Sequence, residues 1–148
     1  MERRTHVIFG IFLFVLLWGA LKLDLPLSAL AAAGAMFPDL DYKKTPDARH
    51  RKVAHNVWVL IAISAAIFLL TSSLEFAAAF ALGFLSHILA DSLTPLGVYP
   101  LYPFRKQRAW FLVRGRAVIT TGSRGEKVFQ SLMVAATVFV VLLVSDVL

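Results

Sequence analysis

The stretch VAHNVWVLIAISAAIFLLTSSL, residues 53–74, contains no Asp, Glu, Lys or Arg and is the longest such run in the chain. Its only ionisable side chain is His55. An α-helix rises 1.5 Å per residue, so about 20 residues are needed to cross the ~30 Å hydrocarbon core of a bilayer. The sequence therefore predicts a membrane-spanning helix here, and no other apolar stretch is long enough to cross alone.

The composition of the whole chain agrees with a membrane protein. Apolar residues make up 59% of the 148 residues and charged residues 16%, whereas soluble domains average roughly 45–50% and ~25%. These values exclude a disordered chain and disfavour a soluble domain. The absence of cysteine excludes disulfides and thiolate metal sites. The length suits one membrane-embedded domain over residues 1–148.

Four further apolar stretches flank the longest one. They cover Val7–Leu21, Leu25–Phe37, Phe76–Ala90 and Val128–Val144. We expect an all-α, polytopic bundle of about five membrane helices, in which the second is short or re-entrant. In the last long loop, residues 110–119 interleave apolar and basic side chains, which predicts a small hairpin at the membrane surface.

The basic residues predict the orientation of this bundle. If five helices cross in turn, fourteen of the fifteen Lys/Arg lie on the side of the N-terminus, and only Lys22 lies on the other. Loops rich in Lys and Arg stay in the cytoplasm. We therefore predict a multi-pass protein of the cell membrane (the inner or plasma membrane), with the N-terminus in the cytoplasm and the C-terminus outside.

The same topology gathers the histidines and several aspartates at the cytoplasmic face. Ionisable residues at the ends of membrane helices are costly and usually functional. His87 and Asp91 are four residues apart and share a helix face. Asp39 and Asp41 follow Pro38, and both side chains point the same way if that segment is extended.

Imidazole and carboxylate ligands without thiolate suit Zn, with Mn or Fe as alternatives. The candidate ligands outnumber the four that bind one tetrahedral zinc ion. Either two ions bind, or some of these residues hydrogen-bond to the ligands and do not bind the metal themselves. Asp41 or Asp91 is the candidate general base. No separate organic cofactor site is predicted. The predicted metal site consists of His6, Asp39, Asp41, His50, His55, His87 and Asp91.

The chain contains four motifs in this order: Thr5-His6, Pro38-Asp39-x-Asp41, His50-Arg51-x-x-x-His55 and Gly83-x-x-x-His87-x-x-x-Asp91-x-x-Thr94-Pro95-x-Gly97. Together they resemble the YdjM-like family of inner-membrane proteins, which are classed as metal-dependent hydrolases and described as LexA-binding. The resemblance covers about residues 5–104 and implies a multi-helix membrane protein with the seven metal-site residues at a shared polar site. The Pro-Asp and His-x-x-x-Asp elements are also similar, more distantly, to zinc-dependent phospholipases C.

The chain departs from the family pattern at two positions in or next to the His50-Arg51-x-x-x-His55 motif. Lys52 stands where the family has glycine, and Asn56 stands where it often has a small hydroxyl residue. Neither change removes a candidate ligand. Glu126 follows a Gly-rich segment that matches a C-terminal acidic element of the family, and it is a further candidate acid near the substrate.

The leading hypothesis is hydrolysis of a lipid or lipid-linked phosphoester at the cytoplasmic face. Arginine pairs well with phosphate oxygens, although the positive-inside rule also explains the basic loops. The alternatives are a non-catalytic metal-binding or ion-handling membrane protein, and a membrane anchor for a soluble regulatory protein. Direct nucleic-acid binding is not expected, because no recognition fold is visible. The arginines predicted to contact substrate are Arg51, Arg105, Arg108, Arg114 and Arg116.

Overall fold

The computed structural model describes residues 1–21, 24–40, 54–106, 112–113 and 116–145. These residues form five α-helices, and the helical fold class is as predicted. The helices are α1 (Arg3–Leu21), α2 (Ser28–Met36), α4 (Val57–Thr71), α5 (Leu74–Ser92) and α6 (Arg124–Val144). Two 3₁₀ turns flank α2: η1 (Leu25–Leu27) precedes it, and η2 (Phe37–Asp39) follows it.

Two short strands lie in the last long loop. β1 (Leu112–Val113) pairs antiparallel with β2 (Arg116–Ala117), with Leu112 opposite Ala117. This pairing falls within the segment for which the sequence predicts a hairpin. The backbone N–H of Ile119 then donates to the carbonyl of Leu93 at 3.2 Å, which joins the end of this loop to the C-terminal end of α5.

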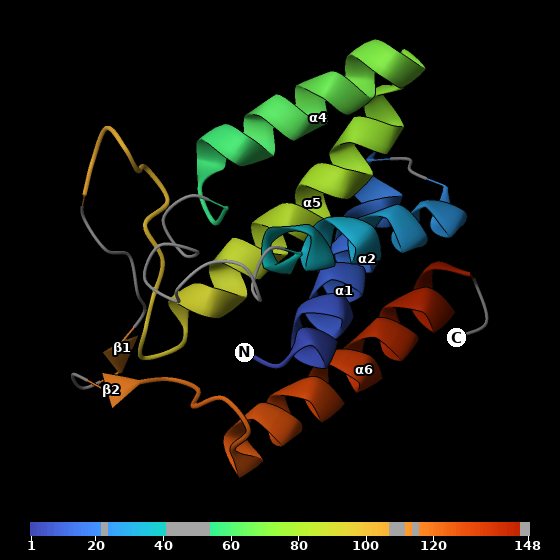
Figure 1. Cartoon of the computed structure of the whole chain (residues 1–148). Coiled ribbons are helices and arrows are strands. Elements are labelled where there is room, and N and C mark those ends of the chain that lie inside the picture. Colours follow the sequence, from blue (N-terminus) through green and yellow to red (C-terminus); the bar gives the residue numbers. More distant parts are fainter. Residues whose placement is uncertain (22–23, 41–53, 107–111, 114–115, 146–148) are drawn as a thin grey trace.

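Helix α5 is the centre of the bundle (Figure 1). It packs against α1, α2 and α4, whereas α6 packs against α1. One buried cluster joins Phe14 of α1 to Ala31 of α2 and Ala79 of α5. A second cluster on α5, around Phe80 and Phe84, contacts the inner face of α4.

Glycines allow α2 and α5 to approach each other at backbone distance. A Cβ at Gly83 would collide with the carbonyl of Ala31, and a Cβ at Gly34 would collide with the carbonyl of Phe80. Small residues are typical of helix contacts in membranes because they let backbones approach closely. This close packing fixes the position of α2 along α5, on which the site described below depends.

The expectation that residues 53–74 form the one stretch long enough to cross a membrane alone was wrong. Within this stretch, α4 has only 15 residues and is about 22 Å long. The helix begins late because the Asn56 side chain accepts hydrogen bonds from the backbone N–H groups of Trp58 and Val59, as an N-cap does. It ends at Ser72, whose left-handed backbone (φ 54°) closes the last turn.

Among the described residues, α5 and α6 are the two helices that are long and apolar enough to cross a membrane. Helix α4 is apolar but shorter. Helix α6 leaves most of its apolar side chains exposed, as a surface in contact with lipid would. A bundle of five crossings remains a prediction.

Candidate metal centre

Four elements bring five of the predicted ligands together. His6 lies near the start of α1, Asp39 ends η2, His55 precedes α4, and His87 and Asp91 lie near the end of α5. The side chain of Asp39 is 18% exposed, and the other four are at most 2% exposed. The structure thus brings together five of the seven residues predicted as ligands, from distant parts of the sequence.

The donor atoms of four of these residues face one another. His55 Nε2 lies 2.8 Å from His87 Nε2, 3.5 Å from Asp39 Oδ1 and 3.5 Å from Asp91 Oδ2. His87 Nε2 lies 3.7 Å from Asp39 Oδ1 and 3.8 Å from Asp91 Oδ2. Ligands about 2.0–2.1 Å from a tetrahedral ion are themselves roughly 3.3 Å apart. These five spacings are therefore close to those of one tetrahedral site, and we call Asp39, His55, His87 and Asp91 the four-donor set.

A backbone carbonyl fixes the orientation of the His87 ring. His87 Nδ1 donates to the carbonyl oxygen of Ala35 at 2.6 Å, so Nδ1 carries hydrogen. In a neutral imidazole, Nε2 then carries a lone pair. Metal-bound histidines usually make this same type of second hydrogen bond.

The lone pair of His87 Nε2 faces two carboxylate oxygens that are acceptors too. Its neighbours are the two carboxylate oxygens and His55 Nε2. A cation between these atoms would satisfy them together, because each would then donate electrons to it. The chemistry of the donor set therefore fits a divalent metal, with imidazole and carboxylate as ligands.

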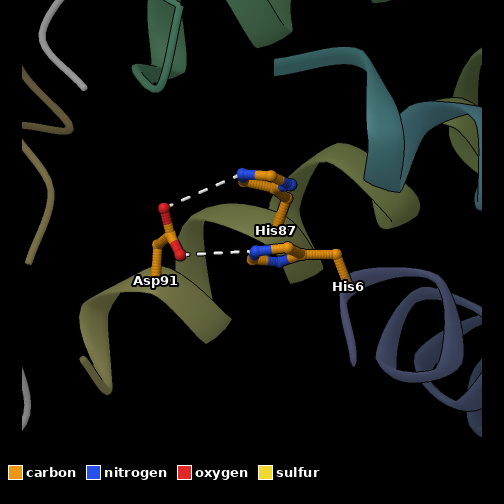
Figure 2. Close-up of side chains that lie close together, drawn as sticks. All are labelled: His6, His87 and Asp91. Atoms are coloured by element: carbon orange, nitrogen blue, oxygen red, sulfur yellow. Dashed lines mark ion pairs between the residues drawn. The ribbon is translucent and has the colours of Figure 1, made fainter. Parts of the chain in front are cut away.

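With its other carboxylate oxygen, Asp91 faces the imidazole of His6 (Figure 2). Asp91 Oδ1 lies 3.4 Å from His6 Nε2 and accepts a hydrogen bond from the Met1 amine at 3.0 Å. The His6 ring stacks on the His87 ring, with centroids 3.7 Å apart and an angle of 13°. His6, His87 and Asp91 thus form a second donor group that shares two residues with the four-donor set.

The remaining predicted site residues are divided between described and undescribed segments. Asp41, His50, Arg51, Arg108 and Arg114 lie outside the described residues. For Arg116 the structure describes the backbone in β2. Arg105 is exposed and lies outside both donor groups.

Glu126 is fully buried and joins two helix starts. Its Oε1 accepts hydrogen bonds from the Glu2 backbone N–H at 2.8 Å and from Thr5 Oγ1 at 2.6 Å. Its Oε2 accepts from the Gly122 backbone N–H at 2.6 Å. These contacts position α1 against α6 next to His6, and Glu126 belongs to neither donor group.

Two contacts of the site were missed by sequence reasoning. The Ala35 carbonyl is a backbone group, and the Met1 amine is a chain terminus, so neither belongs to a motif of side chains. The run of small residues in α2, together with Gly83, was the available signal for a close helix contact. It did not indicate which carbonyl would face His87.

Comparisons with known proteins agree with the resemblance drawn from the motifs. No curated protein matches the chain, and no solved structure does. The family model described as YdjM inner membrane protein matches residues 1–147. Since this match covers nearly the whole chain, the protein belongs to the YdjM inner membrane protein family.

Proposed function

We propose that this protein is a membrane-embedded, metal-dependent hydrolase that acts on a lipid or lipid-linked phosphoester at the cytoplasmic face. The observation that carries the proposal is the four-donor set of Asp39, His55, His87 and Asp91, in which the Ala35 carbonyl directs His87 Nε2 toward the other donors. Zn is the ion that best suits these ligands, and Mn or Fe would also fit. A bound divalent ion supplies a Lewis acid that polarises the scissile group and makes water more acidic.

The chain prepares this site by holding the ligands rigidly in a dry environment. His87 is fixed by its bond to Ala35, and Asp91 is fixed by contacts on both carboxylate oxygens. Burial strengthens electrostatic interactions because the surrounding dielectric constant is low. Asp39 is the one partly exposed member of the four-donor set, so we assign the substrate entrance to its side.

The proposed reaction adds water to the phosphorus atom. The bond between phosphorus and the leaving alcohol oxygen breaks, and one proton passes from the water to that alcohol. A carboxylate is the general base in this scheme, and the sequence offers Asp41 or Asp91 for the role. Products are a phosphate ester with one fewer organic substituent and a free alcohol.

The contacts of Glu126 support the proposed orientation. They bring the first turns of α1 and α6 together, so both helices begin on the same side of the bundle. The predicted topology also starts both helices at the basic, cytoplasmic face. The four-donor set, adjacent to the first turns of α1, would then face the cytoplasm.

One observation favours a second candidate, a non-catalytic cation site. Three members of the four-donor set are almost fully buried. Buried ligands are typical of structural metal ions, which stabilise a fold without taking part in a reaction. Such an ion would still bind the same ligands. Turnover, and not binding, separates the two functions.

A turnover assay tests the hydrolase. Protein purified in detergent without chelator is incubated with a phospholipid extract, and phosphorus-containing products are followed by ³¹P NMR. We expect product formation by the wild type and its loss in Asp91→Asn, whereas Glu75→Gln, an exposed acid on the same helix, retains it. Bound metal in the wild type without any turnover would refute the hydrolase and favour the non-catalytic site.

A further inference from the structure

The loop that follows α5 presents apolar side chains to the outside. Its last part, residues 99–106, is shaped by backbone hydrogen bonds, such as that from the Arg105 N–H to the Leu101 carbonyl at 2.9 Å. Leu101 is exposed, and Phe104 is 78% exposed. An exposed apolar patch with a polar rim is typical of a surface that contacts a membrane or another protein. We call this segment the 99–106 loop.

The 99–106 loop lies beside the start of α4 (Figure 1). The backbone N–H of Val57 donates to the carbonyl of Pro100 at 2.9 Å. The rings of Trp58 and Phe104 meet edge to face, with centroids 5.3 Å apart. These two contacts join the exposed side chains of the loop to the first turn of α4.

The outer side of α4 is an exposed apolar surface. Helix α4 packs against α5, and its other side carries large exposed side chains. Since the protein belongs to an inner membrane family, lipid is the expected surrounding of such a surface. Trp58 lies at the end nearest the loop, and tryptophan is enriched where a membrane meets water. The exposed large apolar residues of α4 are Trp58, Ile61, Phe68, Leu69 and Leu70.

Two basic residues follow directly where the apolar part of the loop ends. Arg105 and Lys106 are both exposed. Long basic side chains keep their charge at the headgroups while their stems lie against apolar groups, and anionic lipids attract them. The order from the apolar surface of α4 through Trp58 and Phe104 to two cations matches the order of a bilayer from hydrocarbon to phosphate. A protein partner on this continuous surface would have to displace lipid from α4.

We propose that the 99–106 loop is an interfacial anchor that binds the anionic surface of the membrane at the end of the bundle that carries the metal centre. Leu101 and Phe104 enter the boundary between headgroups and acyl chains, and Arg105 and Lys106 bind the phosphates of anionic lipids. Arg105 thus has a partner other than the substrate that the sequence predicts for it.

The anchor also sets the depth of the metal centre in the membrane. The loop follows α5, which carries Asp91, and it contacts the start of α4, which His55 precedes. A loop held at the surface keeps both residues near the level of the headgroups. Lipid binding by the loop does not depend on the proposed hydrolase, so either proposal can fail alone.

Depth-dependent quenching of tryptophan fluorescence tests where the loop lies. The three native tryptophans, Trp18, Trp58 and Trp110, are replaced by phenylalanine, and Phe104→Trp then places a single probe in the loop. The matched control, Thr121→Trp, places the probe in an exposed polar turn before α6. Both proteins are placed in phosphatidylcholine nanodiscs whose lipids carry bromine either near the headgroup or near the end of the acyl chain. Iodide in solution is the second quencher.

We expect bromine near the headgroup to quench the probe at position 104 most strongly, and iodide to quench it weakly. The control at position 121 should show the reverse, with strong quenching by iodide. Leu101→Trp in the same background repeats the test at the second exposed apolar position, and it should behave as Phe104→Trp does. Agreement between the two loop positions would show that the result does not depend on one substitution.

Brominated phosphatidylglycerol, compared with the same mole fraction of brominated phosphatidylcholine, tests the role of the two cations. We expect the anionic lipid to quench the probe at position 104 about threefold more efficiently, because basic side chains near the surface attract anionic headgroups. Arg105→Gln/Lys106→Gln should abolish this preference. The control Arg124→Gln/Lys127→Gln removes two exposed charges from the first turn of α6 and should retain it.

Two results would overturn the proposal. If iodide quenched the probes at positions 101 and 104 as strongly as the control and bromine did not, the loop would lie in water and its apolar patch would suit a soluble protein partner instead. If the two brominated headgroups quenched equally, or if both double variants lost the preference equally, Arg105 and Lys106 would not be the lipid contacts. Metal content and turnover do not enter these measurements, so they test the anchor separately from the hydrolase.

Discussion

Replacing Glu126 by glutamine tests how α1 is held in position beside the metal centre. The buried carboxylate accepts three hydrogen bonds, two at Oε1 and one at Oε2. Glutamine can keep its oxygen toward the Glu2 N–H and Thr5 Oγ1, but its NH₂ group then faces the Gly122 N–H. Hydrogen bonds to charged groups contribute about 1.5–3 kcal/mol each. The variant loses the hydrogen bond from Gly122 and weakens the two at Oε1, which should lower the free energy of unfolding by about 3 kcal/mol.

For a chain of this size, 1 kcal/mol corresponds to about 2–4 °C in Tm. We therefore expect Glu126→Gln to unfold roughly 6–12 °C below the wild type, measured by tryptophan fluorescence in detergent. The control is Glu75→Gln, which changes an exposed glutamate in the first turn of α5 and should shift Tm by less than about 2 °C. Equal shifts in the two variants would refute the reasoning.

Three further predictions follow from the packing and the site. Gly83→Leu should separate α2 from α5, because the leucine side chain would collide with the Ala31 backbone. The free energy of unfolding should fall by about 3 kcal/mol, seen as loss of folded protein in size-exclusion chromatography. Unchanged yield and Tm would contradict the close contact. Asn56→Ala removes the N-cap of α4 and should cost about 1 kcal/mol, while Asn56→Asp keeps the cap; identical Tm values for the two variants would count against it. If one ion occupies the four-donor set, His6→Ala should retain more bound metal per chain than His55→Ala, as measured by elemental analysis. An equal loss of metal in the two variants would instead require His6 to be a ligand.

Much of the site could be predicted from sequence because it depends on helix periodicity and on the order of the segments. The spacing of His87 and Asp91 places them on one face wherever the helix forms. The alternation of apolar stretches and basic loops brings His6 and His55 to the same end of the bundle. Local pattern and topology therefore suffice for these residues.

The details that make the site suitable for a metal depend on tertiary packing. The hydrogen bond from His87 to the Ala35 carbonyl requires that α2 lie at one position along α5, and that position depends on backbone contact at Gly34 and Gly83. Hydropathy also overestimated the length of α4, because it contains no information on the Asn56 N-cap or on the left-handed backbone of Ser72.

The most direct measurement of the central claim is the metal content of the purified wild type beside that of Asp91→Asn. Asparagine keeps the shape of Asp91 but removes the charge that faces His55 and His87. We predict that the wild type, purified without chelator, retains at least one divalent ion per chain. Asp91→Asn should remain folded but bind the ion at least about 100-fold more weakly, since loss of a residue that only hydrogen-bonds to a ligand already weakens metal binding by about 10–100-fold. A wild type without a bound divalent ion after incubation with Zn, Mn and Fe, or an Asp91→Asn variant with the same affinity, would contradict the account.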